Sequence, residues 1–133
     1  PSVPSRGAVR VPMEMRYSLP SVPVQINGRN FQALVDTGAR DQLFLNDQVV
    51  RELGLESAAS SGGTFKAAGL GGMIRGRTFR LPVIYVGGMP VPNVSVDSSG
   101  GPWRVRIGSE LLERWRTTFD FRNRALWLEM PAL

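Results

Sequence analysis

The sequence predicts a mainly β, closed barrel-like fold with one or two short helices. Short apolar segments recur along the 133 residues, and turn residues separate them roughly every 8–12 residues, a spacing typical of all-β folds. Apolar residues make up 42% of the chain, which is enough for a hydrophobic core. Because Pro and Gly are frequent at the start, we expect a flexible N-terminal arm over residues 1–15 and a single domain over residues 16–133.

The N-terminal half of this domain is expected to hold a hairpin, a strand and a short helix. Apolar residues alternate within residues 22–35, and Asn27-Gly28 supplies the positive φ angles of a tight two-residue turn. Residues 43–45 are apolar throughout, as in a short buried strand. Asn46 is expected to cap a short helix that Gly54 ends.

The C-terminal half is expected to be dominated by hairpins. Residues 57–63 predict a polar loop, and Gly69-Leu70-Gly71-Gly72 predicts the pliable tip of a hairpin over residues 64–79. The remaining segments follow the same alternation of apolar runs and turns. They are strands over 81–86, 91–96 and 103–107, a helix over 110–115, and a closing hairpin over 117–130.

The composition excludes several classes of chemistry. The chain contains neither cysteine nor histidine, which rules out disulfides, thiolate or imidazole metal sites and catalysis by a Cys or His side chain. If the protein is an enzyme, carboxylates are the most suitable acid–base groups that remain. We therefore expect neither a metal nor a cofactor.

The charge and hydropathy patterns bear on possible partners. The net charge of +5 is the excess of sixteen Lys and Arg residues over eleven Asp and Glu residues. The basic residues are scattered rather than clustered, so we expect no nucleic-acid binding, although a basic β-barrel that binds nucleic acid stays open as an alternative. No run of 18 apolar residues occurs, and membrane attachment would need a segment absent from this chain. Localisation is left open; an N-terminal extension would suit a periplasmic or membrane-anchored protein.

Asp36-Thr37-Gly38 is the strongest candidate for chemistry. An apolar strand, Ala33-Leu34-Val35, delivers Asp36 directly into a glycine turn. A carboxylate at the end of a buried strand faces whatever lies beyond that end, and burial is expected to raise its pKa, as an acid–base catalyst requires. An Asp that only caps a turn is the alternative interpretation, and the local residues do not decide between the two.

Three landmarks together resemble those of the retropepsin-like aspartic proteases. Val35-Asp36-Thr37-Gly38-Ala39 resembles the active-site motif of this family, and Gly69-Leu70-Gly71-Gly72-Met73 resembles its glycine-rich flap. Val105-Arg106-Ile107-Gly108-Ser109-Glu110-Leu111-Leu112 is similar to the second landmark, a strand that ends in an apolar residue and Gly before a short helix. The order and spacing match over residues 22–130 and look more like the bacterial branch than the viral one. The resemblance implies a retropepsin-like β-barrel with a flap hairpin.

The resemblance also implies an activity and a partner. Members of the family hydrolyse peptide bonds with water held between two Asp carboxylates, and this chain has only one such motif. A homodimer that contributes one Asp36 from each subunit is therefore expected, with a protein or peptide as substrate. A catalytically silent dimerisation or peptide-binding module of the same fold is the alternative. The expected catalytic residues are Asp36, Thr37 and Gly38, and the expected substrate contacts are Ala39, Arg40, Asp41, Gly69, Leu70, Gly71, Gly72, Met73 and Ile107.

The sequence departs from the viral pattern in the charges beside the cleft. Arg40 stands where the viral enzymes carry an acid, and Ser109-Glu110 stands where they carry Arg. The exchange suggests an ion pair between Arg40 and Glu110. Three flap arginines could bias the cleft toward acidic peptides, although a solvent-exposed role is the favoured interpretation; they are Arg75, Arg77 and Arg80. The chain ends, residues 9–15 and 125–130, are expected to join a sheet between subunits.

Overall fold

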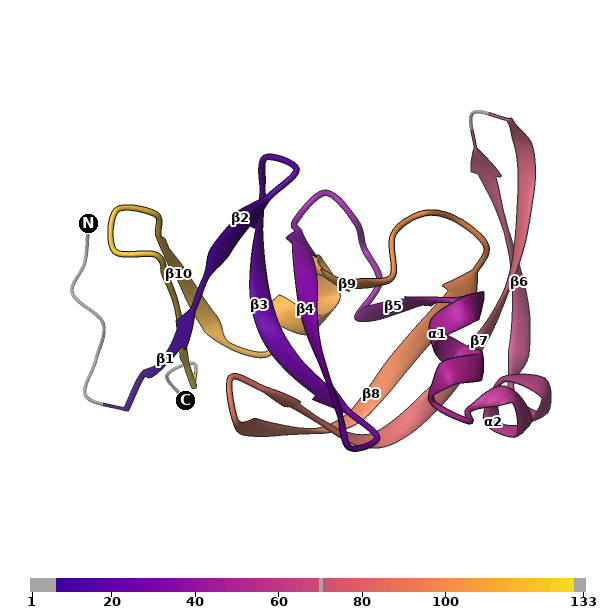
Figure 1. The fold of residues 1–133 in the computed structure, drawn as a ribbon, viewed down its shortest axis with the longest axis horizontal. Helices are drawn as coiled ribbons and strands as arrows, with labels where there is room; N and C mark the ends of the chain where they lie inside the picture. Colours follow the sequence, from indigo (N-terminus) through magenta and orange to yellow (C-terminus); the bar gives the residue numbers. More distant parts are fainter. Residues whose placement is uncertain (1–6, 70, 131–133) are drawn as a thin grey trace.

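A computed structural model describes residues 7–69 and 71–130 of the chain as strands connected by tight turns and three short helices (Figure 1). In chain order the elements are β1 (Val9–Pro12), β2 (Glu14–Arg16), β3 (Leu19–Ile26), β4 (Arg29–Asp36), β5 (Leu43–Asn46), α1 (Asp47–Glu52), α2 (Glu56–Ser61), β6 (Gly63–Gly69), β7 (Gly72–Val86), β8 (Met89–Ser99), β9 (Val105–Gly108), α3 (Ser109–Leu112), β10 (Arg116–Asp120) and β11 (Ala125–Glu129). The predicted mainly β class is confirmed.

The strands form two sheets. The larger has the order β2-β3-β4-β9-β5-β8-β7-β6, and the smaller has the order β1-β11-β10. β3 also pairs with β7, at Val24 with Val86 and at Gln25 with Tyr85, so the larger sheet curves around a common core. Its inward face carries fully buried aliphatic side chains such as Ile26, Leu45 and Ile84. The β6–β7 hairpin projects from this body (Figure 1).

The local signals for the first hairpin and the first helix are confirmed. Asn27 and Gly28 have φ angles of 49° and 82° and form the turn between β3 and β4. The Asn46 side chain accepts a hydrogen bond of 2.9 Å from the backbone N–H of Val49, which caps α1. Asn46 Nδ2 also donates to the carbonyl of Gly101 at 3.2 Å, so the same side chain links α1 to the loop before β9.

The predicted polar loop over residues 57–63 is wrong, because most of it forms α2. Glu56 and the alanines within this helix favour helical backbone, and Ala59 is buried against the core. The serines suggested a loop, but one buried face is enough to hold a helix of this length. The third helix, α3, covers Ser109–Leu112 and is shorter than the predicted 110–115.

The N-terminal segment pairs with the same chain from Val9 onward. β1 runs antiparallel to β11, with Val9 opposite Leu128 and Pro12 opposite Ala125, and Val11 and Met13 are buried. The two segments that were expected to join subunits thus pair with each other inside one chain. Residues 1–6 of the predicted arm lie outside the described residues, and the division into an arm and a domain stays a prediction.

Candidate active site

The Asp36 carboxylate lies at the end of β4, where the chain turns away from the sheet. β4 runs parallel to β9, and Asp36 is in register with Gly108. The backbone N–H of Gly38 donates to Asp36 Oδ1 at 3.0 Å, and the N–H of Ala39 donates to the Asp36 carbonyl at 3.1 Å. The side chain is half-buried, whereas Thr37 and Gly38 are exposed. The turn therefore holds one carboxylate oxygen and presents its own tip outward.

The end of β9 packs directly against this turn. Ser109 N–H donates to the carbonyl of Ala39 at 2.7 Å, and Gly108 N–H donates to the carbonyl of Gln42 at 3.1 Å. A Cβ at Gly108 would lie 2.8 Å from the Ala39 oxygen and would clash with Asp41. Glycine is thus required at this position by close backbone approach. The two sequence landmarks, 70 residues apart along the chain, are adjacent in space.

A cross-strand row of side chains lies on the same face of the sheet as Asp36. Thr78 is in register with Asp97, Asp97 with Phe44, Phe44 with Arg106, and Arg106 with Leu34. In-register residues share a face of the sheet, and so do residues two apart on one strand. Asp36 follows Leu34 by two residues on β4, which places its side chain about 7 Å farther along on this face.

A cavity of about 520 Å³ lies over the middle of this row, at Asp97, Phe44 and Arg106, and we call it the larger cavity. The β6–β7 hairpin contributes Phe65, Ala67 and Ile74 to its lining. The loop before β9 forms another wall, and Trp103 of this loop makes an edge-to-face contact with Tyr17 at a centroid distance of 5.2 Å. The remaining lining residues are Asp41, Phe44, Asp97, Ser99, Gly100, Gly101, Pro102 and Arg106.

Charged side chains lie within these largely apolar walls. Arg106 Nη2 bonds Asp41 Oδ2 at 2.8 Å, and the Arg106 guanidinium carbon lies 4.7 Å from the centre of the Phe44 ring. The Asp41 and Arg106 side chains are only 11% and 23% exposed. Burial and the nearby Asp41 carboxylate raise the pKa of Asp97, against the opposing effect of its hydrogen bond from Thr78. Negative charge at Asp97 is therefore less well compensated than at Asp41.

The structure gathers some of the predicted contacts and separates others. Asp41 lines the larger cavity, and Ala39 packs beside the Asp36 turn. Ile107 is only 1% exposed and belongs to the core cluster, so Arg106, rather than Ile107, presents a side chain to the Asp36 face. In residues 7–69 and 71–130, Arg40 forms no ion pair with Glu110. The pair formed beside the cleft is Asp41 with Arg106.

The glycine-rich tip lies at the end of the projecting hairpin. Gly69 ends β6 and Gly72 begins β7, and Gly71, Gly72 and Met73 are exposed, Met73 by 64%. Leu70 lies outside the described residues. None of the described tip residues lines the larger cavity, which touches the hairpin nearer its base.

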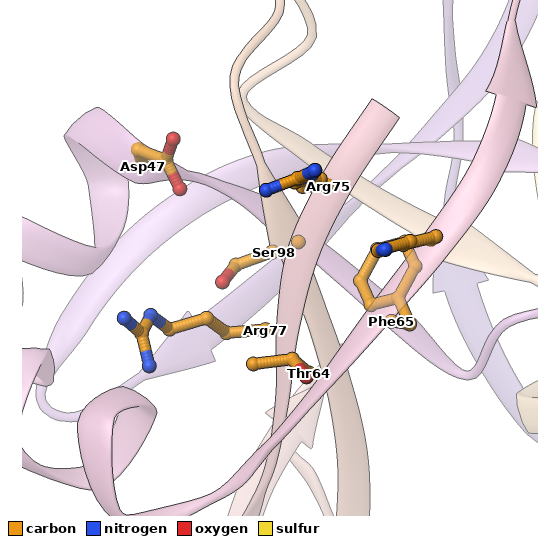
Figure 2. A pocket seen from close by; sticks show the side chains of 8 residues that line it. Asp47, Thr64, Phe65, Arg75, Arg77 and Ser98 are labelled. Carbon is orange, nitrogen blue, oxygen red and sulfur yellow. The ribbon is translucent and has the colours of Figure 1, made fainter. Parts of the chain in front are cut away.

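The arginines after the tip lie away from the larger cavity. Arg75 and Arg77 line a second cavity of about 370 Å³, the outer cavity, together with Asp47 and Ser98. In Figure 2 the Arg77 guanidinium extends toward the Asp47 side, and Phe65 lies on the other side of Ser98. Phe65 lines both cavities. Arg80 donates to Asn93 Oδ1 at 3.2 Å, so the arrangement does not support a cleft biased toward acidic peptides by these arginines.

Sequence reasoning missed the residues that make the larger cavity distinctive. Arg106, Asp97, Phe44 and Trp103 come from three separate segments that only the sheet register brings together. One signal was available, because Arg106 interrupts an otherwise apolar strand between Val105 and Ile107. A charged residue in such a strand requires a partner or a solvent-facing cavity.

Two further features concern cofactors and membranes. In the described ranges, no three Asp or Glu side chains come close enough to hold a metal ion. Among the same residues, none of the helices is long and apolar enough to span a bilayer.

Comparisons with known proteins agree with the landmarks. Residues 22–102 match the family model described as aspartyl protease. A crystal structure of a retropepsin-like aspartic protease from Rickettsia conorii resembles this chain with a TM-score of 0.66 and 19% sequence identity, covering 92% of this chain and 88% of that one. This likeness shows a shared retropepsin-like fold. A search of curated proteins finds no match.

Proposed function

The chain belongs to the aspartyl protease family, and we propose that it is an aspartic endopeptidase that works as a homodimer, with one Asp36 from each subunit. The observation that carries this proposal is the position of Asp36. Its side chain is half-buried at the end of β4, held by its own turn, on the sheet face that carries the larger cavity.

The dimer follows from the number of carboxylates that the reaction needs. Only one Asp-Thr-Gly occurs in the chain, so a second carboxylate of the same kind must come from another copy. A two-fold axis close to the Asp36 turns would bring the two together. The exposure of Thr37 and Gly38 supports this, because these residues at the tip of the turn are free to contact the partner subunit.

The proposed chemistry uses the two Asp36 side chains in different protonation states, because two adjacent carboxylates cannot both ionise without strong repulsion. The ionised carboxylate takes a proton from a water molecule, and the resulting hydroxide attacks the scissile carbonyl carbon. The protonated carboxyl donates to the carbonyl oxygen, which forms a tetrahedral diol. Proton transfer to the nitrogen then breaks the C–N bond and releases an amine and a carboxylic acid.

The substrate is proposed to bind in an extended conformation between the β6–β7 hairpin and the row from Thr78 to Leu34. An extended peptide can use backbone hydrogen bonds to strands on both sides, while alternate side chains enter cavities. The exposed glycines Gly71 and Gly72 suit a tip that closes over bound peptide. In this role the hairpin acts as a flap.

The test is peptide cleavage by the wild-type protein and by Asp36→Asn, with Glu113→Gln, at an exposed position immediately after α3, as a matched control. We expect cleavage of a peptide mixture by the wild type and the control, and none by Asp36→Asn. Adding Asp36→Asn to a fixed amount of wild type, under conditions of subunit exchange, should also reduce activity, since each mixed dimer lacks one carboxylate. Activity that is unaffected by the added variant would exclude the shared site.

A catalytically silent peptide-binding module would give a different result. Peptides would bind to the wild type and Asp36→Asn equally, and mass spectrometry would detect no cleavage by either. That outcome would refute the proposed endopeptidase while leaving the family assignment intact.

A further inference from the structure

We propose that the larger cavity is a subsite that selects a basic side chain of the substrate, Lys or Arg, and that Asp97 determines this preference. The inference rests on the proposed function, because it names the substrate class of the same site. It is carried by the shape of the cavity, by the pairing of its charges and by the position of Asp97 in the cross-strand row.

The shape and lining suit a long side chain with a charged end. The cavity measures about 520 Å³, and its lining includes the large apolar side chains of Phe44, Phe65, Ile74 and Trp103. Lys and Arg have long aliphatic stems that bury well against such surfaces while their charged ends reach a polar group. Asp97, at the Thr78 end of the row, lines the same cavity.

The cation already present in the cavity is committed to another partner. The Arg106 guanidinium is bonded to Asp41 Oδ2 and lies over the Phe44 ring. This arrangement gives Asp41 Oδ2 a cationic partner and holds Arg106 in the lining of the cavity. Asp97 forms no ion pair in the described residues, and its side-chain hydrogen bond comes from the neutral hydroxyl of Thr78.

The cavity therefore carries an excess of negative charge. Its lining contains two carboxylates, Asp41 and Asp97, and one guanidinium, that of Arg106. Glu110 adds further negative potential at Asp97. A basic side chain would supply the missing counter-charge, whereas an acidic one would add a third carboxylate to a poorly solvated site.

The raised pKa of Asp97 is consistent with this balance. Burial contributes most, Asp41 and Glu110 act in the same direction, and Thr78 and Arg106 act in the opposite one. The basic residues of the hairpin do not neutralise the cavity, because Arg75 and Arg77 line the outer cavity instead. The electrostatic potential in the larger cavity is thus negative although the whole chain has a net charge of +5.

The experiment measures peptide binding independently of cleavage, using the dimeric protein with Asp36→Asn to prevent turnover. Extended peptides that differ at one position carry Lys, norleucine or Glu, and this position is moved through the four central residues. Norleucine matches the Lys stem without its charge. At one position we expect Lys to bind about tenfold more tightly than norleucine, or about 1.4 kcal/mol, and Glu to bind most weakly.

Asp97→Asn in the same background should reduce the Lys preference to about twofold or less, with norleucine binding unchanged. Asn can still accept the Thr78 hydrogen bond, so the fold should persist, and urea denaturation checks this. Asp97→Glu should retain the preference for Lys. Asp47→Asn, which changes an acid of the outer cavity, should also retain it.

Equal binding of Lys and norleucine at all positions would overturn the inference, as would a Lys preference that survives Asp97→Asn. The proposed function is tested separately by cleavage with the wild-type protein. Cleavage without a basic preference would refute only the subsite. An Asp97-dependent Lys preference without cleavage would support the subsite and refute the endopeptidase.

Discussion

Arg106 and Asp41, 65 residues apart in sequence, form an ion pair with an Nη2–Oδ2 distance of 2.8 Å. The pair connects β9 to the loop that follows the Asp36 turn. Both side chains are largely buried, and Asp41 Oδ1 and Arg106 Nε have no hydrogen-bond partner among the described residues. The two charges therefore depend strongly on each other.

This dependence predicts strong coupling in a double-mutant cycle. Asp41→Asn or Arg106→Met alone should lower the free energy of unfolding by about 2–3 kcal/mol, because each leaves a mostly buried charge without its partner. The double variant should lose no more than either single variant, since Met still covers Phe44 and no charge is left. Urea denaturation measures the three changes, and additive losses would show that the pair does not act as a unit.

Gly108→Ala should disturb the Asp36 turn. The new Cβ would clash with the Asp41 carbonyl and would lie 2.8 Å from the Ala39 oxygen, so the backbone must move. We expect a loss of about 3 kcal/mol in unfolding free energy together with loss of peptide cleavage. Gly7→Ala, which has open space around it, is the matched control and should change stability by less than about 0.5 kcal/mol. A Gly108→Ala protein as stable as this control would contradict the close approach.

Most of the fold follows from local sequence signals. The Asn27-Gly28 turn, the Asn46 cap and the alternating apolar residues of β3 act over a few residues, so they can be recognised without the rest of the molecule. Asp36 and Gly108 belong to motifs whose order along the chain indicates the fold. α2 was missed because its stability depends on burying Ala59 against distant strands.

The lining of the candidate site depends on long-range register. Asp97, Phe44 and Arg106 become neighbours only when β8, β5 and β9 pair as they do. A shift of one residue would move Arg106 into the core and Ile107 onto the Asp36 face. The sequence leaves this choice open, which explains why Ile107 was predicted as a substrate contact and Arg106 was not.

Asn46 is expected to stabilise the wall of the larger cavity as well as α1. Asn46→Ala should cost about 1–2 kcal/mol, because it removes the cap on Val49 and the bond to the Gly101 carbonyl. Asn46→Ser keeps a capping oxygen and removes the donor to Gly101, so it should recover part of this loss. Relative to the wild type, Asn46→Ser should exchange its amide hydrogens faster in the loop before β9, while exchange in α1 changes less. Equal protection of that loop in wild type and Asn46→Ser would argue against the link.

Gly76→Ala is expected to displace the β6–β7 hairpin. A Cβ at this position would clash with the Phe65 ring and with the carbonyl oxygen of Ser98. Because that carbonyl is part of β8 and cannot easily move, the hairpin must shift instead. Because Phe65 lines both cavities, we expect kcat/KM for peptides to fall while the sheet stays folded. Gly7→Ala, which lies outside this hairpin and has open space around it, provides the comparison. Similar kcat/KM values for the two variants would exclude a special role for Gly76.

Asp97 should make the stability of the protein depend on pH in a defined direction. Its pKa in the folded state is raised above the ordinary 3.8, by burial first and then by Asp41 and Glu110, while Thr78 and Arg106 oppose the shift. The folded protein thus holds this proton more tightly than the unfolded chain does. The stabilising contribution is fully present below the unfolded pKa and is lost as pH rises through the folded one.

Asp97→Asn removes this ionisation and keeps an acceptor for Thr78. Relative to the wild type, the variant should therefore gain stability at pH 7, and the gain should shrink as pH falls toward 3.8. Urea denaturation of both proteins between pH 3.5 and pH 7 measures this difference directly, and changes in other groups common to both proteins cancel. If the stability difference between the two proteins stays constant, or grows as the pH falls, the surroundings of Asp97 do not disfavour its ionised form. The excess negative charge assigned to the larger cavity would then lose its support.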